Sequence, residues 1–285
     1  MTQAPLKHFE SVPIDAVRHY WNQRPCNLRH SPEPVGTRAY FEQVAHRKYL
    51  VEPHIPRFAD FPSWAGKRVL EIGCGIGTDS ISFAQAGAHV TAVDLSEASL
   101  NLTRQRAEIF NVRDRVRTIH ANAEELDTVL KPEPFDLIYS FGVIHHTPHP
   151  DNALCALRRF TGPDTHLKFM VYHRHAWKVM AIVLAEGYGR FWKLDDLVAR
   201  SSEAQTGCPV TYTYTRKTAA AWLARTGFEP TRFAVDHVFP YRIEDYKHYR
   251  YIKSWYFRML PQPLFRALER TMGWHLLIDA KPATT

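Results

Sequence analysis

The chain has 285 residues, 45% of them apolar and 23% charged, with a net charge of +7, a composition typical of a globular protein with one large domain. Its basic residues form no run of five or six, so we expect no nucleic-acid-binding arm. No apolar stretch is long enough to span a bilayer and the N-terminus has no apolar signal core, so we expect no stable membrane insertion. The four cysteines are far apart without a Cys-x-x-Cys pair, which disfavours a disulfide framework or a cysteine zinc site and favours a cytoplasmic location.

The first 66 residues precede any strand pattern. A short helix is expected over residues 11–20, and a second over 37–49 with Thr37 as its N-cap. Prolines and a glycine break the chain between the two helices, and Pro53 and Pro56 are expected to end the second one. This region is predicted to form a helical segment ahead of the main domain.

From residue 67 the pattern alternates between short apolar runs and amphipathic stretches. Ser96 and Asp151 are expected to cap two of the helices, and Gly162-Pro163 to turn the chain before the fifth strand. Strands separated by helices imply right-handed crossovers and a mostly parallel sheet. The expected strands are 68–72, 89–93, 116–119, 135–140 and 166–172, and the expected helices are 78–86, 97–110 and 151–160.

After the fifth strand the regular alternation is interrupted. Thr215 is expected to cap a helix that Gly227 closes, and residues 236–260 are crowded with aromatic and basic side chains. The remaining expected elements are helices 176–186 and 191–200, a polar loop 201–209, helix 216–226, strand 228–235, helix 264–272 and strand 274–279, which makes seven strands in all.

The most informative stretch is Val-Leu-Glu-Ile-Gly-Cys-Gly-Ile-Gly-Thr, residues 69–78. Gly73, Gly75 and Gly77 follow a buried strand and the acid Glu71, which predicts a tight turn that a ligand approaches closely. This spacing resembles motif I of the class I S-adenosylmethionine (SAM)-dependent methyltransferases. A nicotinamide-binding fold is the alternative, but its usual Gly-x-Gly-x-x-Gly spacing is absent.

Three further signals extend the resemblance over residues 67–172 and 215–280. Asp94 ends the second strand and is followed by Leu95. The loop that begins with Asn122 and Ala123 is similar to the acidic adenine loop of this superfamily, with Asn in place of the usual Asp. The stretch 135–148, which includes Phe141, resembles the strand-four motif of the small-molecule branch.

The resemblance implies a Rossmann-like, doubly wound α/β fold with SAM as cofactor. In such a site Asp94 accepts both ribose hydroxyls, Leu95 packs on the adenine face and the Asn122 oxygen accepts from the adenine amino group. Glu71 organises the loop or the methionine amino group, while Cys74 is expected to be a small filler residue. The implied cofactor-binding residues are Glu71, Gly73, Cys74, Gly75, Gly77, Asp94, Leu95, Asn122, Ala123 and Phe141.

His145 and His146 follow the fourth strand and are the candidate catalytic residues. A neutral imidazole there could take a proton from the acceptor, and Tyr20 or His173 could do so instead. The alternative is that the two histidines only orient their loop. Adjacent histidines cannot easily point at one ion, so no metal site is predicted. The candidate residues for holding a flat, apolar or anionic acceptor are Trp21, Arg24, His173, Tyr241 and Tyr246.

The sequence therefore predicts an enzyme that transfers a methyl group from SAM to an O, N or C atom of a small organic molecule. Residues 1–66 are expected to form a helical lid, and 67–285 a SAM-binding domain with a cap insertion at about 173–214. The alternatives are a methyltransferase that acts on RNA or protein and a SAM-binding protein without catalysis. The oligomeric state is left open by the sequence.

Overall fold

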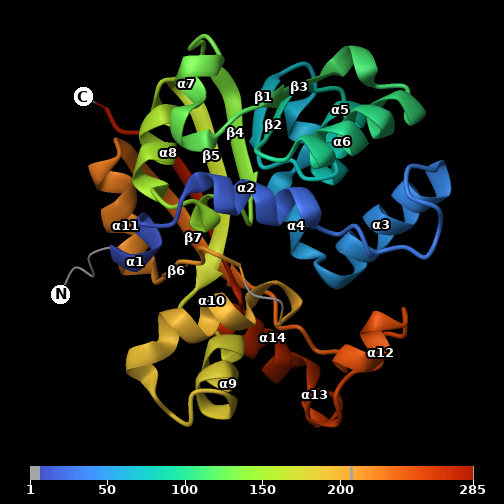
Figure 1. The fold of residues 1–285 in the computed structure, drawn as a ribbon, viewed down its shortest axis with the longest axis vertical. Coiled ribbons are helices and arrows are strands. Elements are labelled where there is room, and N and C mark those ends of the chain that lie inside the picture. The colour runs from blue at the N-terminus through green and yellow to red at the C-terminus, as the bar shows by residue number, and fades with distance from the viewer. Residues whose placement is uncertain (1–6, 206–207, 285) are drawn as a thin grey trace.

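The computed structural model describes residues 7–205 and 208–284, and a single sheet runs through its centre (Figure 1). The strand order is β3-β2-β1-β4-β5-β8-β7, with the short β6 paired to β5. The pairs from β3 to β5 are parallel, and β8 runs antiparallel to both β5 and β7. The strands are β1 (Arg68–Ile72), β2 (His89–Asp94), β3 (Val116–His120), β4 (Phe135–Phe141), β5 (Thr161–His173), β6 (Thr213–Tyr214), β7 (Phe228–Asp236) and β8 (His275–Pro282). The predicted Rossmann-like, mostly parallel sheet is confirmed.

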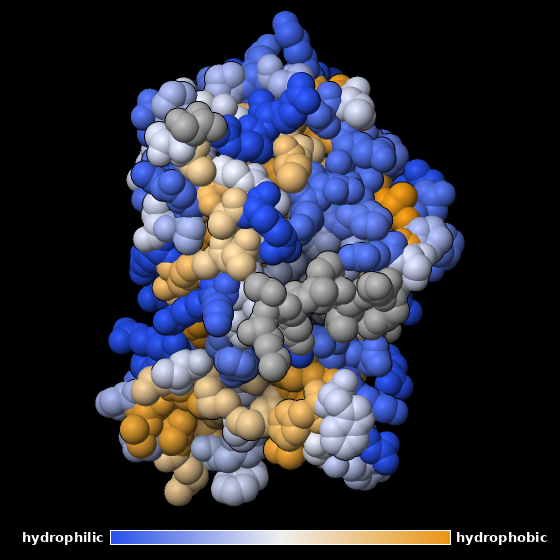
Figure 2. Space-filling view, turned by 90° about the vertical axis from the view of Figure 1, so that its left-hand side faces the viewer, coloured by the Kyte–Doolittle hydropathy of each residue, from blue (hydrophilic) through white to orange (hydrophobic). Residues whose placement is uncertain are grey.

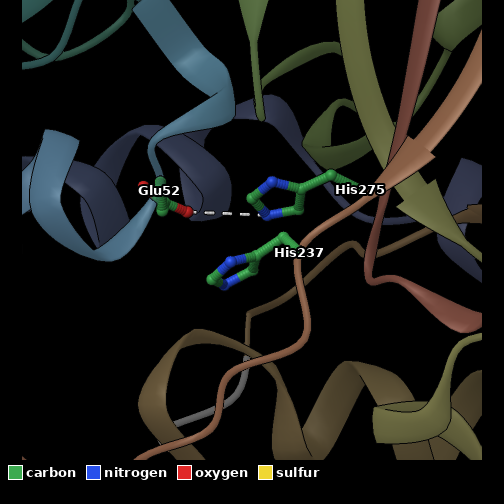
Figure 3. A group of neighbouring side chains, drawn as sticks. All are labelled: Glu52, His237 and His275. Carbon is green, nitrogen blue, oxygen red and sulfur yellow. Dashed lines mark ion pairs between the residues drawn. The ribbon is translucent and has the colours of Figure 1, made fainter. Parts of the chain in front are cut away.

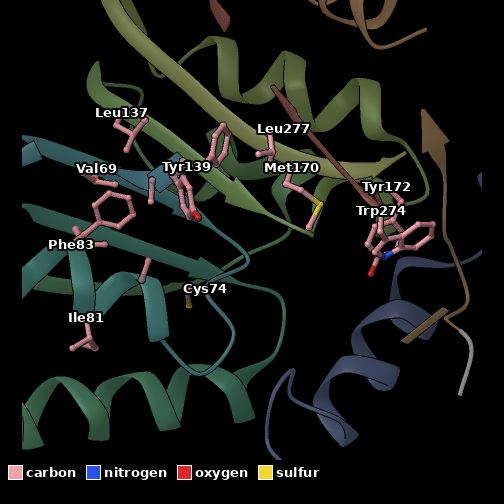
Figure 4. Close-up of a cluster of buried hydrophobic side chains, with 14 of the residues drawn as sticks. Val69, Cys74, Ile81, Phe83, Leu137, Tyr139, Met170, Tyr172, Trp274 and Leu277 are labelled. Atoms are coloured by element: carbon pink, nitrogen blue, oxygen red, sulfur yellow. The ribbon is translucent and has the colours of Figure 1, made fainter. Parts of the chain in front are cut away.

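Helices cover both faces of the sheet, as the alternating apolar pattern requires. One buried cluster joins the sheet to α4, α5 and α6, and a second joins its other face to α7, α8 and α11. In the first cluster the rings of Tyr172 and Trp274 stack at 4.0 Å, where β5 ends and β8 begins (Figure 4). The helices within the main domain are α5 (Thr78–Gln85), α6 (Glu97–Ile109), α7 (Leu126–Val129), α8 (Pro150–Arg158) and α11 (Arg216–Arg225).

Other helices lie before the sheet or beyond its carboxyl edge. Helices α9 and α10 follow β5, and α12, α13 and α14 connect β7 to β8 (Figure 1). These elements are α1 (Lys7–Glu10), α2 (Ile14–Gln23), α3 (Arg38–Val51), α4 (His54–Ala59), α9 (Trp177–Ala185), α10 (Leu194–Gln205), α12 (Ile243–Lys247), α13 (Trp255–Met259) and α14 (Gln262–Met272). The short 3₁₀ turns are η1 (Phe61–Trp64), η2 (Arg113–Arg115), η3 (Ala123–Glu125), η4 (Ile144–His146) and η5 (Phe191–Lys193).

Local signals placed most helix starts correctly. The hydroxyls of Thr37 and Ser96 accept from the backbone N–H three residues on, at 3.2 Å in both cases. Thr215 and Thr218 form a reciprocal capping box at the start of α11. Each of these caps satisfies an N–H that the first turn of a helix leaves without a partner.

The structure corrects four expectations. Asp151 does not cap α8, because both its oxygens accept from Arg225 at 2.6 and 2.8 Å and His149 is the N-cap residue instead. Gly162-Pro163 lies inside β5, whose pairing with β4 shifts register there. Pro56 sits within α4, and α10 continues to Gln205 through half of the expected polar loop. The last two errors have separate causes: proline is tolerated in the first turn of a helix, and a polar helix end has the composition of a loop.

The proposed cap region, residues 173–214, contains α9 and α10. Several large apolar side chains there are exposed, among them Leu184, Tyr188, Phe191 and Trp192. Figure 2 shows apolar residues gathered over the lower part of this face of the molecule. Among the described residues, no helix has the length and apolar character needed to cross a bilayer.

Candidate active site

The glycine turn follows β1 at the carboxyl edge of the sheet. Gly73, Gly75 and Gly77 have φ angles of 72°, 55° and 75°, which glycine adopts without strain. A Cβ at Gly73 would lie 2.3 Å from Val143, and one at Gly77 would lie 2.9 Å from Thr103, whereas no atom of the described residues lies within 4 Å of one at Gly75. The turn is therefore packed on two sides and open at Gly75, where a ligand can approach the backbone.

Cys74 lies within this turn but belongs to the core. Its side chain is buried in the apolar cluster that also contains Ile81 and Phe83 (Figure 4). Burial raises the pKa of its thiol well above the ordinary value, so it stays protonated and unreactive. This placement suits a filler residue.

Asp94 ends β2 beside the open side of the turn. Its Oδ2 accepts from the Gly75 N–H and its Oδ1 from the Ser96 N–H, both at 2.8 Å. The backbone thus fixes the carboxylate, and each oxygen keeps a lone pair for a further donor. The neighbouring Leu95 is partly buried and packs against the same apolar cluster as Trp21 of α2.

Glu71 belongs to a buried polar network between the turn and α3. Ser80 donates to its Oε2, and Asp79 accepts from Lys48 Nζ at 2.7 Å and from the Tyr139 hydroxyl at 3.1 Å. Burial, followed by the charge of Asp79, raises the pKa of Glu71 to about 8. Lys48 comes from the N-terminal segment, so this network connects that segment to the predicted cofactor loop.

The loop after β3 is fixed from within. Asn122 Oδ1 accepts from the Glu124 N–H at 3.1 Å, and Ala123 begins the η3 turn. Glu124 in turn accepts from the Thr147 hydroxyl and, at 2.8 Å, from the His149 N–H. The predicted adenine loop is therefore tied to the loop after β4, while the Asn122 oxygen already serves one internal bond.

The structure places His145 and His146 in a 3₁₀ turn after β4, and both are buried. The His145 ring lies 4.1 Å from the rings of both His146 and Tyr172, and neither of its nitrogens has a hydrogen-bond partner among the described residues. Burial lowers its pKa well below 6.5. His146 Nδ1 donates to the Val210 carbonyl at 2.8 Å, which makes Nε2 the acceptor nitrogen of the neutral ring.

Tyr20, Trp21 and Arg24 lie on or directly after α2. The Trp21 ring is 5.6 Å from that of His146 and 5.0 Å from that of Tyr20, whose face Arg24 approaches at 5.8 Å. The helix is held by Asn22, whose Oδ1 accepts from the Ser96 hydroxyl at 3.0 Å. The structure thus brings α2 against both the end of β2 and the histidine pair.

The other predicted acceptor residues divide into two places. His173 is buried and its Nδ1 donates to the Gly273 carbonyl at 3.1 Å, so it holds the backbone ahead of β8. Tyr241 and Tyr246 lie beyond β7, where Arg47 of α3 sits 3.9 Å above the Tyr246 ring and donates to its carbonyl at 2.7 Å. Arg47 is buried, and its Nε and Nη1 have no hydrogen-bond partner among the described residues.

Phe141 is the last residue of β4, and around its ring lie residues that were not predicted from the sequence. Its ring lies 5.4 Å from that of His275 and 5.9 Å from that of His54. His237 stacks on His275 at 4.7 Å, and Glu52 Oε1 lies 3.6 Å from His275 Nε2. Burial lowers the pKa of His54 and of His237 to about 3, so these rings are neutral at pH 7.

A weak sequence signal for this cluster exists only in retrospect. Glu52 and His54 flank Pro53 where α3 ends and α4 begins, His237 directly follows β7, and His275 is the first residue of β8. Chemically versatile residues at strand ends deserve weight because ligands of open α/β sheets bind at that edge. Lys48, Asp79 and Arg47 had no such signal, since a charged residue within a helix is ordinarily solvated.

Comparison with known sequences gives consistent matches. The profile of a family described as a methyltransferase domain matches residues 44–232. A ubiquinone biosynthesis O-methyltransferase from Aromatoleum aromaticum is 37% identical over 124 residues, which is 44% of this chain and 52% of that protein, so the match spans about half of that relative. Another from Pseudomonas fluorescens (strain Pf0-1) is 34% identical over 186 residues, covering 64% of this chain and 70% of the relative.

Solved structures support the fold. The magnesium protoporphyrin IX methyltransferase of Synechocystis PCC 6803 with bound SAH has a TM-score of 0.60 at 16% identity, covering 95% of this chain and all of that one. The 1,6-didemethyltoxoflavin-N1-methyltransferase of Burkholderia thailandensis has a TM-score of 0.55 at 17% identity, covering 99% of this chain and 93% of the other. At these identities the likeness concerns the fold alone.

Proposed function

Because the chain belongs to the methyltransferase-domain family and is a SAM-dependent methyltransferase of small molecules, we propose that its acceptor is a hydroxyl oxygen of an aromatic compound that bears an anionic group. SAM supplies a methyl group that is already activated on a positively charged sulfur. The residues of the chain therefore have to bind the two reactants, align them and accommodate the acceptor proton.

The cofactor side of the proposal rests on Gly75 and Asp94. The open space at Gly75 suits an approaching ligand, and the fixed carboxylate of Asp94 suits two ribose hydroxyls. Glu71 lies at the end of β1, where an ammonium group would find an acid. Leu95, Asn122 and Ala123 are proposed to line the adenine, and Phe141 to separate the cofactor from the acceptor.

The observation that carries the acceptor proposal is Arg47. The Arg47 guanidinium is buried with two nitrogens that lack hydrogen-bond partners among the described residues. Each unsatisfied buried polar group destabilises the folded chain by about 1–3 kcal/mol. An anionic oxygen can accept a charge-assisted hydrogen bond from either of these nitrogens. The tyrosine rings around Arg47, from Tyr246, Tyr249 and Tyr251, suit a flat aromatic body beside that anion.

The oxygen and the proton are proposed on separate grounds. Similarity to proteins named as O-methyltransferases supports an oxygen acceptor. His146 Nε2 is proposed as the proton acceptor, because its Nδ1–H is held by Val210 and its ring faces Trp21. His145 then serves to position His146 through their ring contact, and Tyr20 is a further candidate.

The experiment is label transfer from methyl-labelled SAM to matched pairs of small phenols, one member of each carrying a ring carboxylate. The proposal expects faster O-methylation of the carboxylated member, identified by mass spectrometry of the product. Arg47→Met should remove this preference, whereas Arg117→Met, an exposed arginine on β3, should retain it. Label found only on nitrogen or carbon, or an equal rate for both members of each pair, would contradict the proposal.

A further inference from the structure

Glu52, His237 and His275 bring three metal-binding side chains together at the carboxyl edge of the sheet (Figure 3). One ligand atom from each residue lies within 4.8 Å of the others, and Glu52 Oε1 is 3.6 Å from His275 Nε2. Ligands about 2.0–2.2 Å from a common ion are separated by roughly 3–3.5 Å, so modest side-chain rotation would complete a site. The residues come from the end of α3, the end of β7 and the start of β8.

The backbone at His237 is unusual for a residue with a side chain. Its φ is +72°, a left-handed conformation that costs roughly 1–3 kcal/mol for a residue other than glycine. Two bonds hold it there: the Trp274 N–H donates to its carbonyl at 2.7 Å, and its own N–H donates to Asp236 Oδ1 at 2.8 Å. This conformation places the imidazole beside His275, and strained residues of this kind cluster at functional sites.

His54 provides a hydrogen-bond partner for the ring nitrogen of His275 that faces away from Glu52. Its Nε2 lies 2.8 Å from His275 Nδ1, deep in the protein. If His275 Nδ1 carries the hydrogen and donates it to His54, the lone pair of His275 Nε2 points toward Glu52. A ligating histidine is usually oriented in this way by a partner on its other nitrogen.

We propose that Glu52, His237 and His275 bind one divalent transition-metal ion. Two imidazoles and one carboxylate favour zinc or iron(II) over magnesium or calcium, which prefer oxygen ligands. The alternative, an ion pair between Glu52 and a protonated His275, is disfavoured because the imidazole is buried against two other histidine rings. With three protein ligands the ion retains an open position.

The open position has a chemical role that rests on the proposed function. Phe141 at the end of β4, which is proposed to separate the cofactor from the acceptor, contacts His275, so we place the ion beside the acceptor. A hydroxyl bound to a divalent ion loses its proton more readily, here to the base proposed above, His146 Nε2, and keeps the electron pair on oxygen. That pair forms the new O–CH₃ bond, while the S–CH₃ bond breaks and its electrons go to sulfur.

The test is metal binding by the full chain, independent of methyl transfer. Chelator-treated protein is titrated with Zn²⁺ by calorimetry and with Co²⁺ by visible absorption, and retained metal is measured by mass spectrometry. We expect one ion per chain, with affinity at least 10- to 100-fold weaker in Glu52→Gln, His237→Ala and His275→Ala. Matched controls on the same helix, Glu42→Gln and His46→Ala, are exposed and should bind normally.

Folding and cofactor binding are measured in parallel. Circular dichroism and SAM affinity identify any variant that has lost the fold, and His237→Asn serves as a milder replacement for such a variant. Absence of a stoichiometric ion in wild-type protein, or binding that survives in the ligand variants, overturns the metal site. Metal binding without any label transfer to phenols would instead refute the proposed acceptor and leave the metal site standing.

Discussion

The raised pKa of Glu71 predicts a pH dependence of folding that Glu71→Gln should remove. The carboxyl is buried at the end of β1, with Asp79 and Asp94 disfavouring its charge and Lys48 and Ser80 favouring it. Its pKa is about 8 in the folded chain against 4.5 in the reference state. The unfolded chain therefore binds fewer protons between these values, so the stability contributed by this group is full below pH 4.5 and is lost as the pH rises through 8.

The magnitude follows from these two values. Between pH 6 and pH 9 the wild-type free energy of unfolding should fall by about 2–3 kcal/mol through this group alone, at 1.36 kcal/mol per pKa unit. Glutamine mimics the protonated carboxyl and does not titrate, so the difference between variant and wild type should grow by that amount. Urea unfolding at a series of pH values measures it, with the exposed Glu125→Gln as control. Parallel profiles for all three proteins would refute the raised pKa.

The cofactor gives the same group a second readout. At pH 7 a carboxyl with a pKa of about 8 is about nine-tenths protonated. If the ammonium of SAM binds beside Glu71, binding should release close to one proton at this pH. Calorimetry in buffers with different ionisation enthalpies measures the release, and Glu71→Gln should abolish it. Zero release from the wild type would place the ammonium elsewhere.

The remaining predictions concern ligand binding and turnover. Asp94→Ala should weaken SAM binding by about 1.5–3 kcal/mol per lost charge-assisted bond with the fold intact, and unchanged affinity by calorimetry would remove Asp94 from the site. His146→Gln should lower turnover by about 10²–10⁴-fold with little change in SAM affinity, if it takes the acceptor proton. The same change at His145 should leave the pH profile unaltered between pH 6 and 8, because its pKa already lies well below 6.5. Limited proteolysis should cut between α2 and α3 in ligand-free protein and slow when SAM binds; equal cutting would contradict a lid.

Features encoded within a few residues were predictable from the sequence. The glycine turn, the caps at Thr37, Ser96 and Thr215, and the apolar strands depend on local dihedral and hydrogen-bonding preferences. The prediction that Asp151 caps a helix was wrong for the opposite reason. Its sequence context is that of a cap, but Arg225, far along the chain, offers it two charge-assisted hydrogen bonds that a helix N-terminus cannot match. The reversed direction of β8 is likewise decided by the sheet as a whole.

The acceptor side of the site was predicted only in outline. The aromatic and basic stretch after β7 was recognised, but Arg47 and Glu52, which pack against its Tyr246 and against His275, belong to a helix on the other side of the sequence. No spacing rule connects residues about 200 positions apart, and the pairing arises only when α3 docks beside the ends of β4, β7 and β8. The composition of the stretch after β7 indicated that its tyrosines have a binding partner, but it did not identify Arg47.

The C-terminal part of α3 joins both halves of the candidate site. Lys48 binds Asp79 in the network around Glu71, Arg47 packs on Tyr246, and Glu52 lies beside His275. Because a helix moves as a rigid unit, displacing α3 would disturb the cofactor loop, the tyrosines around Arg47 and the histidine cluster together. Cofactor binding that orders Lys48 and Glu71 should therefore also order the tyrosines around Arg47. Methyl transfer should then require the N-terminal segment even when a chain truncated of that segment still binds SAM.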